Sequence, residues 1–231
     1  MSPLASLALM RTAAVLPVKS FGHAKQRLDA TIGHPDRSEL VAAMLGDVLA
    51  AMNAVADRAD LIVVTAEQRA AEAARAAAAH VVDDPVERGQ SAAAARGVRA
   101  AIARGAHRVL LVPGDCPMLE PGELGRLLDG FPDAGLVIVP DRHGSGTNAL
   151  LIAPPNAIDP SFGPGSFARH AALGAAAGLA VRVAHAPSLE LDVDTASDLA
   201  ALRARLAARP DAAPRTRALL EQLAPPASAV A

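Results

Sequence analysis

Short apolar runs alternate along this chain with longer segments in which apolar residues recur at helical spacing. The run at 61–65 (LIVVT) is apolar at nearly every position, which is typical of a strand buried on both faces. Between 36 and 56, apolar residues spaced four apart predict a helix with one buried side. Strands that alternate with helices predict an α/β fold, namely a single α/β/α domain with a mostly parallel sheet covered on both faces.

The same reasoning assigns the rest of the chain. We expect strands at 13–18, 61–65, 80–83, 108–113, 136–140, 148–153 and 181–185. We expect helices at 36–56, 67–79, 91–104, 166–177 and 196–207, and one that begins at Pro121. Residues 1–208 make up the expected domain. Beyond Arg209 the chain is rich in Pro and Ala and has no clear periodicity, so 209–231 is predicted to be a loosely held C-terminal tail.

The composition narrows the class of protein. With 231 residues the chain is long enough for one well-buried domain. Aromatic residues make up only 2% and Trp and Tyr are absent, so the protein offers no platform on which exposed bases could stack. The net charge of −2 argues against a general nucleic-acid or anionic-membrane surface. No apolar stripe in the sequence indicates an oligomeric state.

The sequence also bears on location. Residues 1–11 are apolar but lack a cationic segment before the apolar stretch, which predicts a lead-in to the first strand rather than a signal peptide. No other apolar run is long enough to span a membrane. The single cysteine, Cys116, excludes an intrachain disulfide and fits a reducing compartment. We therefore expect a cytoplasmic protein.

The only two lysines, Lys19 and Lys25, lie close together after the first predicted strand. Lysine binds phosphate as a compact charge, whereas arginine presents a planar fork. In α/β proteins, the loop between a strand and a helix commonly holds the phosphates of a nucleotide. Together with Arg27, the lysines predict phosphate binding; the alternative is a pair of solvated side chains on a surface loop.

Three aspartates are expected at strand ends, where α/β sheets bind their ligands. Asp115 follows the central strand, and Asp192 and Asp194 lie two apart, so an extended backbone would point both to one side. Such oxygen donors suit Mg²⁺, which binds through a few carboxylates and substrate phosphates. The alternative is that they support the turn before the last helix. There, Thr195 and Asp198 are spaced as in a capping box, and we assign Asp198 to capping.

Two glycine-rich loops, at 143–148 and 162–167, can bring backbone N–H groups close to an anion. Thr147 can donate a hydroxyl from the start of its strand, and Ser166 opens a helix whose N-terminus favours negative charge. The first loop precedes a strand rather than a helix, which excludes a dinucleotide-binding fingerprint. The alternative for either loop is a simple turn. Cys116 is interpreted as a packing residue, because the sequence ties no histidine to it.

Six short segments stand out in this order: LPVK at 16–19, AKQRL at 24–28, PGDCP at 113–117, GTNAL at 146–150, FGPGSF at 162–167 and LDVDT at 191–195. Each is weak alone. As an ordered set over most of the chain, they resemble the phosphoenolpyruvate / 2-phospho-L-lactate guanylyltransferase family, which acts in the biosynthesis of the deazaflavin coenzyme F-420.

The resemblance implies a nucleotidyltransferase fold of the glycosyltransferase-A type. It also implies transfer of GMP from GTP to the phosphate of a small phosphorylated three-carbon acid, with release of pyrophosphate. The implied contacts to the acid are Thr147, Gly163 and Ser166, and the implied magnesium ligands are Asp115, Asp192 and Asp194. The catalytic residues are then Lys19, Lys25 and Asp115, and the nucleotide-binding residues are Lys19, Lys25, Arg27, Gly89 and Ser91.

One segment departs from the pattern of related enzymes, and the resemblance leaves the identity of the acid open. Related nucleotidyltransferases often carry Gly-Leu-Asn at the start of the helix beside the base, and here the segment at 89–91 is GQS, so guanine preference has less support than the transfer chemistry. The Ala- and Arg-rich composition is typical of a GC-rich bacterial genome, where members that use phosphoenolpyruvate are common, so this acid is favoured. The alternatives are 2-phospho-L-lactate and 3-phosphoglycerate.

Two other functions compete. A nucleotidyltransferase for the molybdenum cofactor usually opens with a Gly-Gly-rich loop after the first strand, and the segment at 17–22 (PVKSFG) does not match it. A non-catalytic nucleotide-binding module is the rival from a different class. It would not need three carboxylates beside the phosphates, which favours an enzyme.

Overall fold

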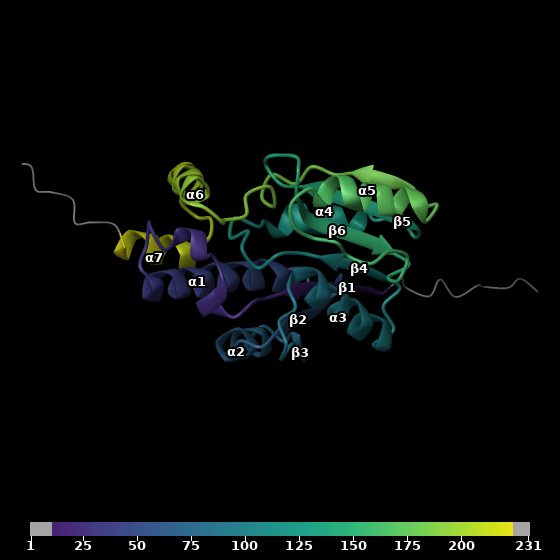
Figure 1. The fold of residues 1–231 in the computed structure, drawn as a ribbon, viewed down its shortest axis with the longest axis horizontal. Coiled ribbons are helices and arrows are strands. Elements are labelled where there is room, and N and C mark those ends of the chain that lie inside the picture. Colours follow the sequence, from purple (N-terminus) through teal and green to yellow (C-terminus); the bar gives the residue numbers. More distant parts are fainter. Residues whose placement is uncertain (1–10, 224–231) are drawn as a thin grey trace, which may run out of the picture.

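The computed structural model describes residues 11–223. The predicted lead-in at 1–10 and the end of the predicted tail at 224–231 lie outside the described residues. Within the described part, a seven-stranded sheet separates two layers of helices (Figure 1). This arrangement confirms the predicted α/β/α fold.

The strands lie in the order β3-β2-β1-β4-β6-β5-β7. All pairs are parallel except those of β6, which runs antiparallel to both β4 and β5. Because β6 is reversed, its first residues lie at the edge where β1 and β4 end. All predicted strands are present, with ends that differ by a few residues: Thr12–Pro17 (β1), Asp60–Thr65 (β2), His80–Asp83 (β3), Arg108–Leu111 (β4), Gly135–Pro140 (β5), Thr147–Ala153 (β6) and Val181–Val183 (β7).

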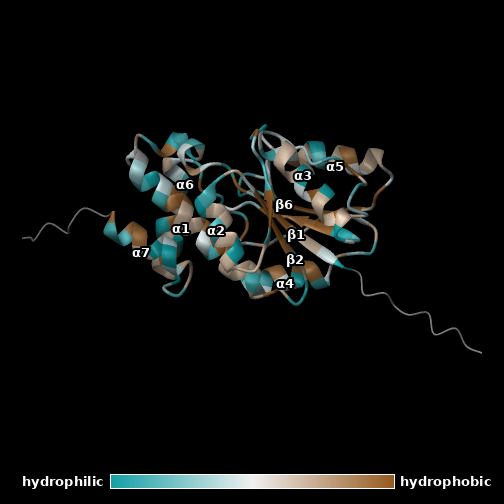
Figure 2. Cartoon of the chain, turned by 90° about the horizontal axis from the view of Figure 1, so that it is seen from below, coloured by the Kyte–Doolittle hydropathy of each residue, from teal (hydrophilic) through white to brown (hydrophobic). Residues whose placement is uncertain are grey.

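Helices cover both faces of this sheet. One layer contains α1 (His34–Asn53), α2 (Gln68–Ala76), α4 (Pro121–Asp129) and α6 (Ala196–Ala208), and the other contains α3 (Gln90–Ala103) and α5 (Ser166–Ala176). Figure 2 shows the apolar strands in brown, enclosed between helices whose hydrophilic positions are teal. None of the described helices is both long and apolar enough to cross a membrane.

Strand β1 contributes side chains to the hydrophobic cores on both faces of the sheet. Ala14 and Leu16 are buried in the core under α1, whereas Ala13 and Val15 are buried in the core under α3. Helix α3 comes so close to β1 that a Cβ on Gly97 would lie 2.2 Å from Val15 Cγ1. Only glycine therefore allows this helix to lie at its present distance from the sheet.

The segment 209–223 corrects the prediction of a loose tail. Pro214–Gln222 forms helix α7, which packs against α1. The buried carboxylate of Asp47 on α1 accepts hydrogen bonds from the backbone N–H groups of Arg215 at 3.1 Å and Thr216 at 2.8 Å. The Thr216 hydroxyl donates to the same carboxylate at 2.7 Å. A carboxylate far away in the sequence thus caps α7, and periodicity does not reveal such a contact.

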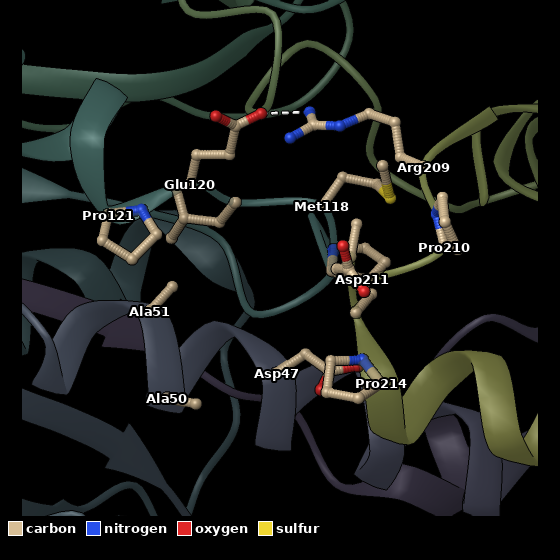
Figure 3. A pocket seen from close by; sticks show the side chains of 14 residues that line it. Asp47, Ala50, Ala51, Met118, Glu120, Pro121, Arg209, Pro210, Asp211 and Pro214 are labelled. Atoms are coloured by element: carbon tan, nitrogen blue, oxygen red, sulfur yellow. Dashed lines mark hydrogen bonds and ion pairs between the residues drawn. The ribbon is translucent and has the colours of Figure 1, made fainter.

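A cavity of about 440 Å³ remains where the segment before α7 meets α1 and the start of α4 (Figure 3). An ion pair between Glu120 and Arg209 spans one side of it. None of the buried polar side-chain atoms that lack a partner in residues 11–223 lines this cavity. No buried polar side-chain atom there thus lacks a partner among the described residues.

Candidate functional site

A larger cavity, of about 780 Å³, opens at the edge of the sheet where β1 and β4 end and β6 begins. This volume suits a ligand of nucleotide size. Segments that are far apart in the sequence meet here, as expected for strand ends in an α/β sheet. The lining includes every predicted site residue except Ser91: Lys19, Lys25, Arg27, Gly89, Asp115, Thr147, Gly163, Ser166, Asp192 and Asp194.

Lys25 lies between two of the predicted carboxylates. Its ammonium forms ion pairs with Asp115 and with Asp194, whose Oδ1 lies 2.5 Å from Lys25 Nζ. Burial by itself would lower the pKa of Lys25, but the two carboxylates outweigh it and raise that pKa, so the side chain is charged at neutral pH. Lys25 therefore relieves part of the repulsion among the three acids.

A residue of helix α1 holds the loop that carries Lys25 in place. Lys25 has a left-handed backbone with φ of 56°, which a lysine rarely adopts without support from its surroundings. Arg37 of α1, only 1% exposed, supplies that support. Its guanidinium donates to the carbonyl oxygens of Ala24 and of Gly22, the latter at 2.9 Å. The position of Lys25 therefore depends on a buried arginine that the sequence analysis did not identify.

Two glutamates fix the start of the same loop. Glu87 accepts hydrogen bonds from the Ser20 N–H at 2.7 Å and the Ser20 hydroxyl at 2.8 Å. Glu67, the N-cap of α2, accepts from the Phe21 N–H at 3.0 Å. Although partial burial opposes it, the hydrogen bonds from Ser20 lower the pKa of Glu87. Both glutamates therefore keep the lysine-bearing loop at the cavity through these hydrogen bonds.

The environment of Asp115 and Asp192 is rich in negative charge. Oδ1 of Asp115 is buried and has no hydrogen-bond partner in residues 11–223. Asp192 accepts a hydrogen bond of 3.1 Å from Asn148 Nδ2. Burial and the neighbouring Asp115 raise the pKa of Asp192 to about 6, although Asn148 and Lys25 act in the opposite direction. Lys25 alone therefore does not balance the acids at this edge.

The segment that carries Asp192 and Asp194 is neither helical nor paired in the sheet. Val193 between them is fully buried while both aspartates reach the cavity, which confirms the predicted alternation. Asp198 forms the predicted capping box with Thr195 at the start of α6. Its carboxylate also accepts the Asp194 N–H at 3.1 Å, so the cap helps to orient Asp194.

The structure bears on the magnesium prediction in two ways. Within residues 11–223, no group of three or more His, Cys, Asp or Glu side chains is arranged as a ready-made metal centre. The unpartnered Oδ1 of Asp115 and the excess of negative charge around Asp192 nevertheless fit a divalent cation bound through carboxylate oxygens. The assignment of Asp115, Asp192 and Asp194 as ligands stays a prediction.

The carboxylate of Asp141, a residue not identified from the sequence, stabilises the turn of the first glycine-rich loop. Its Oδ1 accepts hydrogen bonds from the backbone N–H groups of His143 at 3.1 Å and Ser145 at 3.0 Å. A Cβ on Gly146 would lie 2.6 Å from Asp141 Oδ2, so a larger residue would displace this carboxylate. The tight turn leads directly into β6 and places Thr147 at the cavity.

The second glycine-rich loop precedes α5. Gly163 and Gly165 have φ values of 105° and 71°, which favour glycine. Arg169 of α5 donates hydrogen bonds to the backbone carbonyls of residues 161–164 and so holds the loop against its own helix. Ser166, the first residue of α5, is buried and lines the cavity. The positive end of the α5 dipole therefore lies beside the cavity.

The start of α3 contributes Gly89 and Gln90 to the lining. Ser91, which was predicted to bind the nucleotide, instead accepts a hydrogen bond of 2.9 Å from the Phe162 N–H through its Oγ. This contact ties α3 to the second glycine-rich loop. The structure therefore brings Gly89 to the cavity, whereas Ser91 contacts the second glycine-rich loop, and its role in nucleotide binding stays a prediction.

Thr147 is hydrogen-bonded to His170, a residue to which no role was assigned from the sequence. Its Oγ1 lies 3.0 Å from Nδ1 of His170, which is fully buried. Nε2 of the same ring accepts a hydrogen bond of 2.9 Å from the Ser161 N–H. Burial, with a smaller effect from Arg169, lowers the pKa of His170 to about 4, so the ring is neutral at physiological pH.

Cys116 packs beside the carboxylates, as predicted. It is fully buried, and its Sγ donates a weak hydrogen bond of 3.4 Å to the Leu189 carbonyl oxygen. The same oxygen accepts a hydrogen bond of 2.8 Å from Asn148 Nδ2. Burial raises the pKa of the Cys116 thiol well above its ordinary value, so the reactive thiolate is not available at neutral pH.

Comparisons of the sequence point in the same direction. The family described as "Guanylyl transferase CofC like" matches residues 12–204. A phosphoenolpyruvate guanylyltransferase of Conexibacter woesei is 48% identical over 217 residues, which cover 93% of this chain and 97% of that protein. A 2-phospho-L-lactate guanylyltransferase of Methanothermobacter thermautotrophicus is 34% identical over 82% of this chain and 83% of that protein.

A comparison of structures supports the fold. A solved nucleotidyl transferase, also from Methanothermobacter thermautotrophicus, matches with a TM-score of 0.61 at 22% identity. The match covers 84% of this chain and 97% of the other. It confirms the predicted nucleotidyltransferase fold, and at this identity it bears on the fold alone.

Proposed function

The chain belongs to the family of CofC-like guanylyltransferases, and from this premise we propose that it transfers GMP from GTP to phosphoenolpyruvate in coenzyme F-420 biosynthesis. The acceptor follows the name of the Conexibacter relative. The observation that carries the proposal is the cavity in which both lysines, three aspartates and both glycine-rich loops meet. A cytoplasmic location is part of the proposal, because the single buried cysteine fits a reducing compartment.

In this reaction an oxygen of the acceptor phosphate attacks the α-phosphorus of GTP. The new P–O bond forms as the bond between the α-phosphorus and the oxygen that bridges to the β-phosphate breaks, and pyrophosphate leaves with that oxygen. The protein forms no covalent bond in this scheme. Its contribution is to position two anionic substrates and to offset their charge.

The basic residues are proposed to bind the triphosphate. Lys19, Lys25 and Arg27 line the cavity from the loop that follows β1. The N-terminus of α3 at Gly89 adds a partial positive charge to the lining. Because Lys25 is already held in place, its charge needs little reorganisation when the leaving pyrophosphate gains charge.

Mg²⁺ is the proposed cofactor. Asp115, Asp192 and Asp194 would hold it through carboxylate oxygens, and the unpartnered Oδ1 of Asp115 supports this choice. Once bound, the ion would polarise phosphate oxygens and neutralise part of their charge. The aspartates themselves also keep Lys25 charged and in position.

The acid is proposed to bind between the two glycine-rich loops. The Thr147 hydroxyl, the loop at Gly163 and the start of α5 at Ser166 lie together on this side. A hydroxyl and a helix N-terminus suit a carboxylate or phosphate. The second candidate acceptor is 2-phospho-L-lactate, because a relative bears that name. It and 3-phosphoglycerate differ from phosphoenolpyruvate only in small groups, so pocket shape and one or two hydrogen bonds decide among them.

An assay of pyrophosphate release from GTP in the presence of Mg²⁺ tests the proposal. The assay is run with phosphoenolpyruvate, 2-phospho-L-lactate and 3-phosphoglycerate in parallel, and with ATP and CTP in place of GTP. We expect release with GTP and phosphoenolpyruvate, and a loss of roughly a hundred-fold or more in Asp115→Asn without loss of the fold. The absence of pyrophosphate release with all three acids would refute guanylyl transfer. Release with another acid alone would refute the proposed acceptor.

A further inference from the structure

The hydrogen bonds of His170 determine which of its ring nitrogens carries the proton. A backbone N–H can only donate, so Nε2, which receives the Ser161 N–H at 2.9 Å, must present its lone pair. In the neutral ring the hydrogen is then on Nδ1. That hydrogen points to Oγ1 of Thr147, 3.0 Å away, so Thr147 accepts this bond.

The hydroxyl hydrogen of Thr147 is thereby left for another partner. Within residues 11–223, His170 is the only protein group hydrogen-bonded to Thr147 Oγ1. Thr147 is nevertheless largely buried and lines the cavity. A buried hydroxyl that already accepts one hydrogen bond is stable when it donates its own hydrogen to an acceptor in the cavity.

We propose that His170 is a positioning residue that commits the Thr147 hydroxyl to donate a hydrogen bond to the anionic acceptor acid. This inference rests on the proposed function for the identity of the acid. The direction of the hydrogen bonds from Ser161 through His170 to Thr147 follows from the protein alone. A hydroxyl committed in this way favours a carboxylate or phosphate oxygen and disfavours a donor at the same place.

The surroundings of His170 keep the ring in one state. It is completely buried, and its ring packs in a T-shaped arrangement with that of Phe162, with centroids 5.2 Å apart. The charged group beside it is Arg169, which further disfavours a second proton. Because the ring stays neutral and cannot turn without losing both bonds, the Thr147 hydroxyl keeps its orientation.

The tautomer itself can be measured without any assay of activity. Nitrogen NMR of the imidazoles distinguishes a protonated from an unprotonated ring nitrogen, and the His170 signals are assigned by their absence from His170→Asn. We expect His170 to be neutral at pH 7 with the hydrogen on Nδ1. A hydrogen on Nε2, or a doubly protonated ring, would overturn the proposal whatever the enzyme's substrate.

Two substitutions separate the two bonds of the ring. In His170→Asn the side-chain amide reaches the place of Nδ1 and can still donate to Thr147. In His170→Gln the amide oxygen reaches the place of Nε2 and can still accept from Ser161, but the donor to Thr147 is lost. We expect a roughly five- to ten-fold higher KM for the acid in His170→Gln, an unchanged KM for GTP, and near wild-type values in His170→Asn.

Thr147→Val provides the control for the pathway, because it removes the hydroxyl on which His170 acts. We expect His170→Gln to have no further effect in a Thr147→Val background. Multiplying effects in the double variant, an equal rise in the KM for GTP, or an Asn variant as impaired as the Gln variant would overturn the proposal. An inactive wild-type protein would instead refute the proposed function, and the NMR result would still decide the tautomer.

Discussion

Lys25 binds two of the aspartates at the cavity, Asp115 and Asp194, whereas Asp192 is hydrogen-bonded to Asn148. Its side chain is 9% exposed, so little water replaces a lost partner. Removing one member of such a group leaves the other charges in place without compensation, which destabilises more than the pair itself stabilises. At this residue, stability and proposed catalysis depend on the same charge.

Replacing Lys25 by Met removes the charge and keeps an apolar side chain. We expect the free energy of unfolding at pH 7 to fall by about 2 to 3 kcal/mol, because Asp115 loses its partner and Asp194, half exposed, loses less. Urea unfolding measures the change. The control is Arg11→Met, whose exposed pair with Asp60 should contribute less than about 1 kcal/mol.

The same series contains its own check. Adding Asp115→Asn to Lys25→Met should recover much of the lost stability, because it removes the uncompensated charge. If Lys25→Met were as mild as Arg11→Met, or if Asp115→Asn made it worse, the charges around Lys25 would not be coupled as the ion pairs indicate.

His170 predicts a dependence of stability on pH. Its pKa is about 4 in the folded protein, against an ordinary 6.5, because burial and then Arg169 disfavour the charged ring. Between these values the unfolded chain binds a proton that the folded protein does not, so stability is complete above pH 6.5 and falls as the pH falls toward 4. From pH 7 to pH 5 the contribution should fall by about 2 kcal/mol.

The comparison of wild type with His170→Asn isolates this effect, since both proteins share every other titrating group. Unfolding free energies are measured between pH 4.5 and 7.5. The difference between the two proteins should shift in favour of His170→Asn as the pH falls. Parallel curves would show that His170 titrates normally in the folded protein.

At the scale of elements, periodicity predicted the strands and helices in which the pattern of apolar residues within the segment itself indicates the buried positions. The direction of β6 could not be derived this way, because all of its residues are buried and a buried strand has the same pattern in either direction. Helix α7 was missed for a different reason. It is short, follows Pro-rich sequence and is capped by Asp47 from α1, so its stability comes from a contact far away in the sequence.

Close packing of α3 on β1 makes Gly97 a sensitive position. In Gly97→Ala the new Cβ would lie 2.2 Å from Val15 Cγ1 and 3.0 Å from Val64 Cγ2, so the helix or the strand must move. We expect stability to fall by about 1 to 3 kcal/mol, measured by thermal or urea unfolding. Gly122→Ala in α4 is the matched control, because its nearest contact is 3.7 Å away. That substitution should be neutral or slightly stabilising, and an equal loss in both variants would contradict the packing argument.

At the scale of the whole molecule, the cavity was predictable where residues carry local signatures, such as Asp115 after a strand or Gly146 in a turn. The residues that hold these site residues in place could not be predicted from the sequence. Glu87 acts on Ser20, and His170 acts on Thr147, so neither role exists until the fold brings the segments together. A lone Glu or His has no sequence signal for such a contact.

The proposed binding of Mg²⁺ would connect the charge of the cavity to the stability of the entire protein. An ion that binds only the folded state raises the free energy of unfolding by RT ln(1 + [Mg²⁺]/Kd), or about 2.7 kcal/mol at a hundred times Kd. In the wild-type protein, the ion pairs of Lys25 with Asp115 and Asp194 already offset part of the negative charge that would attract the ion. We therefore expect millimolar MgCl₂ to raise the unfolding midpoint slightly in the wild type and clearly more in Lys25→Met.

The measurement is a thermal unfolding series with and without MgCl₂, in which NaCl keeps the ionic strength constant. The extra response of Lys25→Met should disappear when Asp115→Asn is added, because Asp115 offers the buried oxygen without a partner. An equal response to NaCl at the same ionic strength would show screening rather than binding. If Lys25→Met did not respond to MgCl₂ at all, the aspartates would not be the magnesium ligands, and Lys25 would be the cation for which this edge of the sheet is built.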